Sequence, residues 1–394
     1  MKFGGVFMFR DPGLKTPYHQ LVKEVREATV LIEELGFDSV WLGEHHLGLE
    51  GFGNTPNPLL IASDLASRTS RLRIGFACLV PSLWHPLRLA EDIAVLDHLS
   101  EGRIDVGFGR GPWPRDTVPF HPNADPRDEP KSRQLMRENI EILQKAWTED
   151  VFSHQGPNWT IPPPGIPWNT PYAPPDPRAT VDGVITKLSV FPKPYQKPHP
   201  PLWGTVSSNN SLKQTAELGF NAVTWRPTVL QIREWCQRYA EIRSEREGRP
   251  FKQGEGWAVQ RNTFVASTME EARRDSEESF LRAHGFVSSF YSDMARTLSF
   301  YMDPGEKPGP DMALDWDFLE ERQLLVGPPE HVAEKIHELR EVSGVEEILI
   351  NVHGGGGIPH KTVLRSLELF GTKVIPLFKK SGEEETRATA ARAS

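Results

Sequence analysis

Glu44, His45 and His46 are adjacent in the sequence, directly after an apolar run at 37–42 that is typical of a buried strand. Histidine titrates near neutral pH, so this pair could supply an acid–base catalyst. It could also bind a metal or simply hydrogen-bond the loop. Neighbouring side chains at a strand end point to opposite sides, and the i, i+4 histidine pair of a helical zinc site does not occur here. The pattern therefore favours one catalytic or cofactor-contacting histidine.

Glycine-rich and hydroxyl-rich segments indicate where an anion could bind. GFGRG at 107–111 ends a predicted strand and carries one guanidinium, Arg110, but it lacks the spacing of a dinucleotide-binding fingerprint. SSNNS at 207–211 precedes a predicted helix, where hydroxyls and backbone amides can bind phosphate or simply cap the helix. Together the two segments indicate a site for one phosphate monoester, and FMN carries one. GGGG at 354–357 could also bind phosphate, although the pattern favours a flexible turn.

These segments all follow predicted strands. Strand-like runs alternate with amphipathic helices along the chain, as in the strand at 2–9, the helix at 19–35 and the strand at 37–42. About eight such units favour a (β/α)8 TIM barrel over an open doubly wound sheet. The carboxyl ends of barrel strands form the active site, so we expect these polar segments to meet there. One α/β barrel domain is predicted for 1–380.

Two segments interrupt the alternation. The segment 157–201 contains 14 prolines in 45 residues and cannot be a helix or a central strand. We expect it to lie over the barrel mouth, with a surface insertion of no particular role as the alternative. The segment 284–323 is predicted to be a lid or insertion at the same C-terminal face. The polar tail 381–394 is predicted to be disordered.

Composition excludes several other classes of protein. The formal net charge of −8 is unfavourable for binding nucleic acid or an anionic membrane. No apolar run approaches the roughly 20 residues of a membrane helix, and the N-terminal segment does not have the pattern of a signal peptide. Cys78 and Cys236 are the only cysteines, so neither a disulfide framework nor a cysteine-based zinc site is expected. A cytoplasmic enzyme without a metal is the simplest interpretation.

Two longer motifs carry a family resemblance. The chain contains G-F-D-S-V-W-x-x-E-H-H at 36–46 and H-P-x-R-x-A-E-D-x-x-x-L-D-x-L-S-x-G-R at 85–103. With these motifs it resembles the bacterial luciferase-like flavin-dependent monooxygenases over most of its length, to about residue 380. The resemblance implies a (β/α)8 barrel that binds reduced FMN (FMNH2). It also implies reaction of that flavin with O2 to a C4a-hydroperoxide, which inserts one oxygen atom into a small organic substrate.

The resemblance also implies roles for particular residues. It assigns catalytic roles to His45 and to Asp116, which matches an acidic residue near the luciferase site, with Glu44 as a cofactor-contacting neighbour. The family's non-prolyl cis peptide falls on Ala77–Cys78, beneath the flavin ring.

The flavin phosphate is assigned, by the same resemblance, to Arg110 and to Ser207, Ser208 and Ser211. Two positions depart from luciferase itself. Gly109 replaces its reactive cysteine, and Ser207 replaces the glutamate of its phosphate loop. Light emission from a long-chain aldehyde is therefore not expected.

The expected partners follow from what the sequence lacks. It shows no second dinucleotide-binding motif, so a separate NAD(P)H:flavin reductase is expected to supply FMNH2. Relatives dimerise through barrel-side helices, which implies a homodimer. Two alternatives remain open: an F420-dependent oxidoreductase of the same superfamily, and a non-catalytic flavin-binding protein. The substrate cannot be named from the sequence.

Overall fold

A closed barrel of eight parallel strands lies at the centre of the computed structural model, which describes residues 1–289 and 294–379. β1 pairs with both β2 and β13, and β10 pairs with both β9 and β11, so the sheet closes on itself. The predicted (β/α)8 architecture is therefore confirmed. The barrel strands, in order around the barrel, are β1 (Lys2–Phe7), β2 (Ser39–Leu42), β3 (Arg73–Phe76), β4 (Ile104–Phe108), β9 (Leu202–Thr205), β10 (Asn221–Thr224), β11 (Trp257–Val265) and β13 (Glu347–Asn351).

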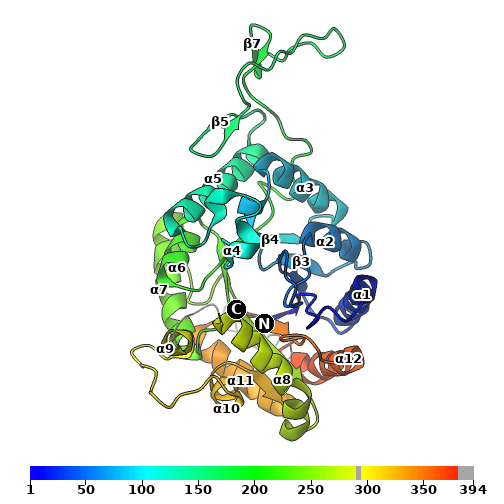
Figure 1. Cartoon of the computed structure of the whole chain (residues 1–394), viewed down its shortest axis with the longest axis vertical. Helices are drawn as coiled ribbons and strands as arrows, with labels where there is room; N and C mark the ends of the chain where they lie inside the picture. Colours follow the sequence, from blue (N-terminus) through cyan, green and yellow to red (C-terminus); the bar gives the residue numbers. More distant parts are fainter. Residues whose placement is uncertain (290–293, 380–394) are drawn as a thin grey trace, which may run out of the picture.

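Helices form a ring around the strands, and Figure 1 views this ring along its axis. Successive helices alternate with the strands, as the sequence pattern predicts. The longer ones are α1 (Tyr18–Glu34), α2 (Pro58–Ala66), α3 (Pro86–Leu99), α5 (Glu129–Thr148), α6 (Asn209–Glu217), α7 (Val229–Glu247), α8 (Met269–Ser288), α11 (Pro329–Ser343) and α12 (His360–Leu369). The shorter ones are α4 (Pro114–Thr117), α9 (Met294–Leu298) and α10 (Trp316–Arg322). A π-helical turn at Phe370–Val374 continues α12.

Local sequence sets several helix boundaries. The side chains of Asn57, Asp128 and Thr228 each accept a hydrogen bond from a backbone amide in the first turn of the helix that follows. Gly248 and Gly344 end α7 and α11 in the left-handed conformation, which glycine adopts without steric cost. These signals are local, which explains why the alternation can be read from the sequence.

Side chains fill the interior of the barrel. Trp41 on β2 and Trp203 on β9 meet across it with ring centroids 5.1 Å apart, although two strands separate them in the sheet. A Cβ atom on Gly75 would lie 2.4 Å from the Trp41 ring, so a glycine in β3 makes room for the indole. A larger apolar core lies between the strands and the helices. The barrel is thus a packed scaffold rather than a channel.

The proline-rich segment does not lie over the barrel mouth, so that prediction was wrong. It forms two small hairpins, β5 (His154–Gln155) with β6 (Thr160–Ile161) and β7 (Thr180–Val181) with β8 (Val184–Ile185). Figure 1 shows it outside the ring of helices, beyond α3 and α5. The buried carboxylate of Glu138 on α5 accepts hydrogen bonds from Asn158 and Trp159. Because these bonds hold the start of the segment against α5, the segment extends from the side of the barrel rather than over its mouth. Tyr172, in its outer part, is 98% exposed.

The predicted lid at 284–323 contains more helix than expected. Its first five residues belong to α8, and His284 is fully buried rather than part of a loop. Later parts form α9, a 3-10 turn at Ser299–Tyr301 and α10. After them β12 (Leu325–Gly327) pairs with the end of β11.

The predicted disordered tail, 381–394, lies outside the described residues. Within 1–289 and 294–379, no helix is both long enough and apolar enough to cross a membrane.

Candidate functional site

A cavity of about 750 Å³ opens at the carboxyl ends of the barrel strands. Residues that follow β1, β2, β3, β4, β9 and β10 line it, together with Gln260 on β11 and residues of α8 and of the predicted lid. Most of the site residues predicted from the sequence meet here, as expected for loops at one end of a barrel. Those that line it are Glu44, His45, Ala77, Cys78, Arg110, Ser207, Ser208 and Ser211.

The two adjacent histidines point in different directions. His45 lines the cavity, where its ring stacks on Trp113 with centroids 5.0 Å apart. His46 turns away, and its Nε2 lies 2.9 Å from the Glu44 carboxylate. His45 is therefore the histidine placed to exchange a proton with a bound ligand.

Asp116 does not line the cavity but lies behind His45. Its Oδ2 is 3.7 Å from Nδ1 of His45, and its Oδ1 accepts a hydrogen bond from Arg115. Burial raises the pKa of Asp116, but His45 and Arg115 outweigh that effect, so its pKa lies below the usual value and the carboxylate is charged. The geometry suits a group that orients His45 and stabilises its charged form.

Glu44 is fully engaged with the protein. Its Oε2 accepts from the Val80 amide at 2.6 Å, and its Oε1 accepts from the Trp84 indole at 2.8 Å. These bonds tie the loop after β3 to the end of β2. Direct contact of Glu44 with a cofactor stays a prediction, whereas its positioning of the neighbouring loop follows from the bonds themselves.

The peptide bond between Ala77 and Cys78 is cis, as the family resemblance implies. Burial raises the pKa of the Cys78 thiol to about 12, so the sulfur remains protonated at neutral pH. A Cβ atom on Gly109 would lie 2.1 Å from the Cys78 sulfur. The cavity therefore does contain a thiol, and it occupies the space that a side chain at position 109 would need.

Arg110 provides positive charge on one side of the cavity. Its Nη1 donates to the Pro126 carbonyl and to the Ser132 hydroxyl, each at 3.0 Å, and no carboxylate of the described residues lies within 4 Å. Burial and the nearby charge of Arg133 lower its pKa. Glu129 already pairs with Arg133 through Nε and Nη2, so Arg110 is the guanidinium of the two that keeps nitrogens for an anionic ligand.

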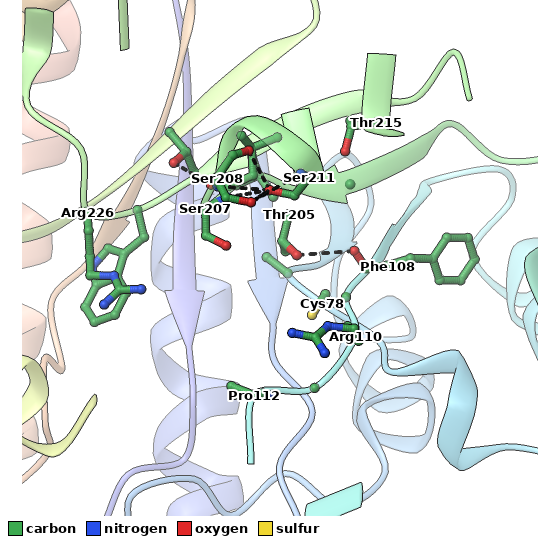
Figure 2. Close-up of a pocket in the computed structure, with 18 of the residues that line it drawn as sticks. Cys78, Phe108, Arg110, Pro112, Thr205, Ser207, Ser208, Ser211, Thr215 and Arg226 are labelled. Atoms are coloured by element: carbon green, nitrogen blue, oxygen red, sulfur yellow. Dashed lines mark hydrogen bonds between the residues drawn. The ribbon is translucent and has the colours of Figure 1, made fainter. Parts of the chain in front are cut away.

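The predicted hydroxyl cluster is the N-terminal cap of α6. Ser208 and Ser211 form a reciprocal capping box, and the Ser207 amide donates to the Ser211 hydroxyl at 3.0 Å. Figure 2 shows these serines and the Arg110 guanidinium around one hollow. The cap thus serves the helix, while the helix N-terminus faces the cavity with its partial positive charge.

Two residues of this anion-binding side were missed in the sequence. Arg133 on α5 donates to the side-chain oxygen of Gln214 on α6 at 3.1 Å. The amide nitrogen of Gln214 is buried without a hydrogen-bond partner and belongs to a residue lining the cavity. A donor left without an acceptor fits a phosphate monoester here. Both residues lie within helices, where no strand-end rule would find them.

Three further polar residues that line the cavity were not predicted from the sequence. Arg10 follows β1, Arg226 follows β10, and Gln260 lies on β11. Aromatic side chains surround them, and the rings of Phe52 and Phe286 stack with centroids 3.8 Å apart. The strand-end rule that selected Arg110 selects Arg10 and Arg226 equally, so the signal was present in the sequence.

Among the described residues no group of three or more histidine, cysteine, aspartate or glutamate side chains is arranged to hold a metal ion. The site combines Arg110 beside the N-terminus of α6, a histidine whose ring faces a carboxylate, and aromatic side chains near Arg10 and Arg226. Such a cavity can hold a phosphorylated planar cofactor beside a second organic molecule.

Comparison with known proteins places the chain in a family. The sequence matches the model of a family described as luciferase-like monooxygenase over residues 1–347. The oxygenase component of the flavin-dependent trigonelline monooxygenase of Acinetobacter baylyi is 25% identical over 373 residues, covering 94% of this chain and 93% of that protein. The alkanal monooxygenase alpha chain of Photobacterium leiognathi is 24% identical, covering 96% of this chain and 99% of that protein.

Solved structures share the fold. The oxygenating constituent of 3,6-diketocamphane monooxygenase from Pseudomonas putida, in complex with FMN, superposes with a TM-score of 0.75 at 24% identity, covering 95% of this chain and 98% of that one. The coenzyme F420-dependent tetrahydromethanopterin reductase of Methanopyrus kandleri gives a TM-score of 0.67 at 19% identity, covering 96% and 99%. At these identities the likeness establishes the fold alone.

Proposed function

The chain belongs to the luciferase-like monooxygenase family, and on that premise we propose that it is the oxygenase component of a two-component system. In this proposal a separate NAD(P)H:flavin reductase supplies reduced FMN, and the chain uses O2 to oxygenate a small organic substrate. The single observation that carries the proposal is one cavity that combines Arg110 and the α6 N-terminus with His45 and the cis peptide at Ala77–Cys78.

The phosphate of FMN would bind between Arg110, Arg133 and the segment Ser207–Ser211. Gln214 would add a donor, since its amide nitrogen has no partner within the described chain. The flavin ring would then extend over Ala77 and Cys78 towards His45. When bound, reduced FMN supplies two electrons, so that one atom of O2 enters the substrate and the other leaves as water.

His45 would move the proton that this reaction requires. Its Nδ1 faces the Asp116 carboxylate, so Nε2 is the nitrogen left to face a ligand. Asp116 would stabilise the charged imidazole and hold its orientation, which makes it a positioning residue. Val287, Phe300 and Met302 line the cavity from α8 and the predicted lid and would exclude water from the reacting groups.

The partners and location also stay proposals. The relative named as an oxygenase component supports a separate reductase. A homodimer is expected from the family resemblance, and light scattering after size-exclusion chromatography would test it. A cytoplasmic location is likewise a prediction.

An F420-dependent reaction is the second candidate, because structures of two F420-dependent enzymes share the fold. In that case no oxygen would be incorporated. The non-catalytic alternative has less support, since the full-length relatives are named as monooxygenases.

The test has two parts. First, the full chain is titrated with reduced FMN and with reduced F420 under nitrogen, and we expect tighter binding of FMN. Second, the FMN-loaded chain is mixed with ¹⁸O2 and a panel containing an aldehyde, a cyclic ketone and an aromatic carboxylate. One ¹⁸O atom in a product supports the proposal, and NADPH should be consumed only when a flavin reductase is added. Preference for F420, or flavin oxidation without labelled product across the panel, would contradict it.

A further inference from the structure

We propose that the substrate is a planar organic anion, of the class of aromatic carboxylates, and that Arg10 binds its negative charge. This inference rests on the proposed function, because it assigns the part of the cavity that the flavin would leave open. It concerns the part of the cavity lined by Arg10 after β1, Arg226 after β10 and Gln260 on β11, rather than the part after β4 and β9 that is proposed for the phosphate.

The charges that line the cavity are strongly unequal. Its charged residues, apart from His45, are Arg10, Arg110, Arg133, Arg226 and Glu44. Glu44 is already engaged with Val80 and Trp84, as described above. Arg133 pairs with Glu129, which does not line the cavity, so the excess of positive charge there comes from Arg10, Arg110 and Arg226, in a chain with a net charge of −8. One phosphate monoester accounts for the side that holds Arg110 and Arg133, but not for the other.

Arg10 has few bonds within the described chain. It is 9% exposed, its Nη1 donates to the Gly354 carbonyl, and its Nε is buried without a partner. No carboxylate of the described residues lies within 4 Å of its guanidinium. Burial lowers its pKa to about 9, so the group is still charged at neutral pH but at an energetic cost. An incoming anion would offset that cost through a charge-assisted hydrogen bond.

The walls beside Arg10 are aromatic. Its guanidinium carbon lies 4.1 Å from the centre of the Phe52 ring, and the opposite face of that ring stacks on Phe286. The Trp113 ring packs edge-on to Phe286 and stacks on His45. Of these rings, Phe52 and Trp113 line the cavity next to the histidine of the proposed reaction, and aromatic walls of this kind pack well against the edge or face of a planar ring.

Arg226 lies on the same side of the cavity. Its guanidinium carbon is 4.0 Å from the centre of the Phe300 ring, in the predicted lid. Figure 2 shows the side chains of Arg226 and Arg110 pointing into one hollow from different sides. Arg226 and Arg10 also both act to lower the pKa of buried His284, which places both charges near it. Arg226 therefore adds positive potential where the anion would lie.

Arg10 also borders a second, smaller cavity of about 240 Å³. Asp11 and Glu24 line that cavity, and their charges disfavour an anion there. This difference favours the large cavity as the side from which a carboxylate approaches Arg10.

The experiment measures binding rather than turnover. The full chain, saturated with oxidised FMN, is titrated by calorimetry with benzoate and 2-naphthoate and with the matching neutral amides. We expect at least one carboxylate to bind about tenfold or more tightly than its amide. Arg10→Met should abolish this preference, Arg10→Lys should retain part of it, and FMN affinity should change little in either variant.

Arg88→Met serves as the matched control, because Arg88 is exposed on α3 and pairs with Asp92. It should leave the preference intact. Equal binding of acids and amides by the wild-type chain would overturn the inference, as would an undiminished preference in Arg10→Met. If Arg10→Met does not fold, Arg10→Lys provides the test. A lysine cannot reproduce the hydrogen bonds of a guanidinium, so an unchanged preference for the acid and an unchanged affinity in Arg10→Lys would contradict anion binding by Arg10. Failure of FMN to bind would instead count against the proposed function.

Discussion

Two arginines at the mouth of the barrel, Arg10 and Arg110, are satisfied very differently from two at the amino end of its strands. At the amino end of the strands, Arg73 pairs with Asp105 at 2.6 Å, and its other two nitrogens donate to the carbonyls of Gly102 and Ile104. All three nitrogens of Arg103 likewise donate to neighbouring oxygens. At the mouth, Arg10 and Arg110 each use only Nη1 within the described chain.

This difference separates structural from functional charge. A guanidinium with every nitrogen bonded joins loops together, and its removal leaves buried oxygens without donors. A guanidinium that keeps two nitrogens without partners contributes little to the fold and is available to a ligand. The comparison predicts that substitutions at the mouth change binding or turnover, whereas those at the amino end change stability.

The largest effect is expected for His45→Ala. Loss of a general acid–base group at the mouth should lower kcat by about 10²–10⁴-fold, while FMN affinity should stay within a factor of a few. Steady-state oxygenation kinetics and flavin titration measure the two effects. His98→Ala is the control, because His98 is exposed at the end of α3, away from the cavity, where it contacts the Lys193 carbonyl and the Tyr195 ring. Full activity of His45→Ala would contradict its assigned role.

Arg110→Gln should come next. Loss of a charge-assisted bond to the phosphate, worth about 1.5–3 kcal/mol, should weaken FMN binding by roughly 10–150-fold. The melting temperature should change little, because Arg110 makes only two hydrogen bonds to the protein. Flavin fluorescence and thermal denaturation check the two statements. A large loss of stability would show that the mouth arginines also hold the fold.

Arg73→Gln tests the opposite end. It leaves Asp105 without its ion-pair partner, and we expect the free energy of unfolding to fall by about 1–2 kcal/mol, since the arginine side chain is partly exposed. Chemical denaturation measures this loss. FMN affinity should match the wild type, and a weakened affinity would remove the distinction between the two ends.

Glu347→Gln should give the most pH-dependent effect. Burial raises the pKa of Glu347 to about 7, Asp105 and Asp38 add to this, and Lys2 opposes it. The folded protein therefore binds a proton more tightly than the unfolded chain, whose glutamate titrates near 4.5. The stability contributed by that proton is fully present below pH 4.5 and is lost as the pH rises to about 7.

The variant should thus be more stable than the wild type at pH 8 and nearly equal to it at pH 4.5. Melting temperatures across this range measure the difference. A constant offset at both pH values would contradict the raised pKa.

Much of the site could be predicted because it lies at strand ends. His45, Cys78, Arg110 and Ser207 each follow a run that the sequence marks as a strand, and the structure brings all four to one cavity. The same rule covers Arg10, which was overlooked because the family motifs do not include it. Arg133 and Gln214 could not be predicted in this way, since they lie inside helices whose rotation about the barrel is set by packing.

The proline-rich segment shows another limit. Its composition excludes helix and central strand, which the structure bears out with short hairpins and loops. Its direction depends on Glu138, whose buried carboxylate holds Asn158 on the outer side of α5. No local pattern in the proline-rich stretch identifies that anchor.

The sequence by itself determined the order of strands and helices, their caps and the polar residues that follow each strand, because these depend on neighbouring residues. The tertiary structure alone decided which of those residues share a cavity. Closure of the barrel joins β1 to β13, at opposite ends of the chain, and places Arg10 on the same cavity as Arg226 and Gln260. Such closure depends on backbone hydrogen bonds between distant segments, so it sets the chemistry of the mouth in a way that no local motif can specify.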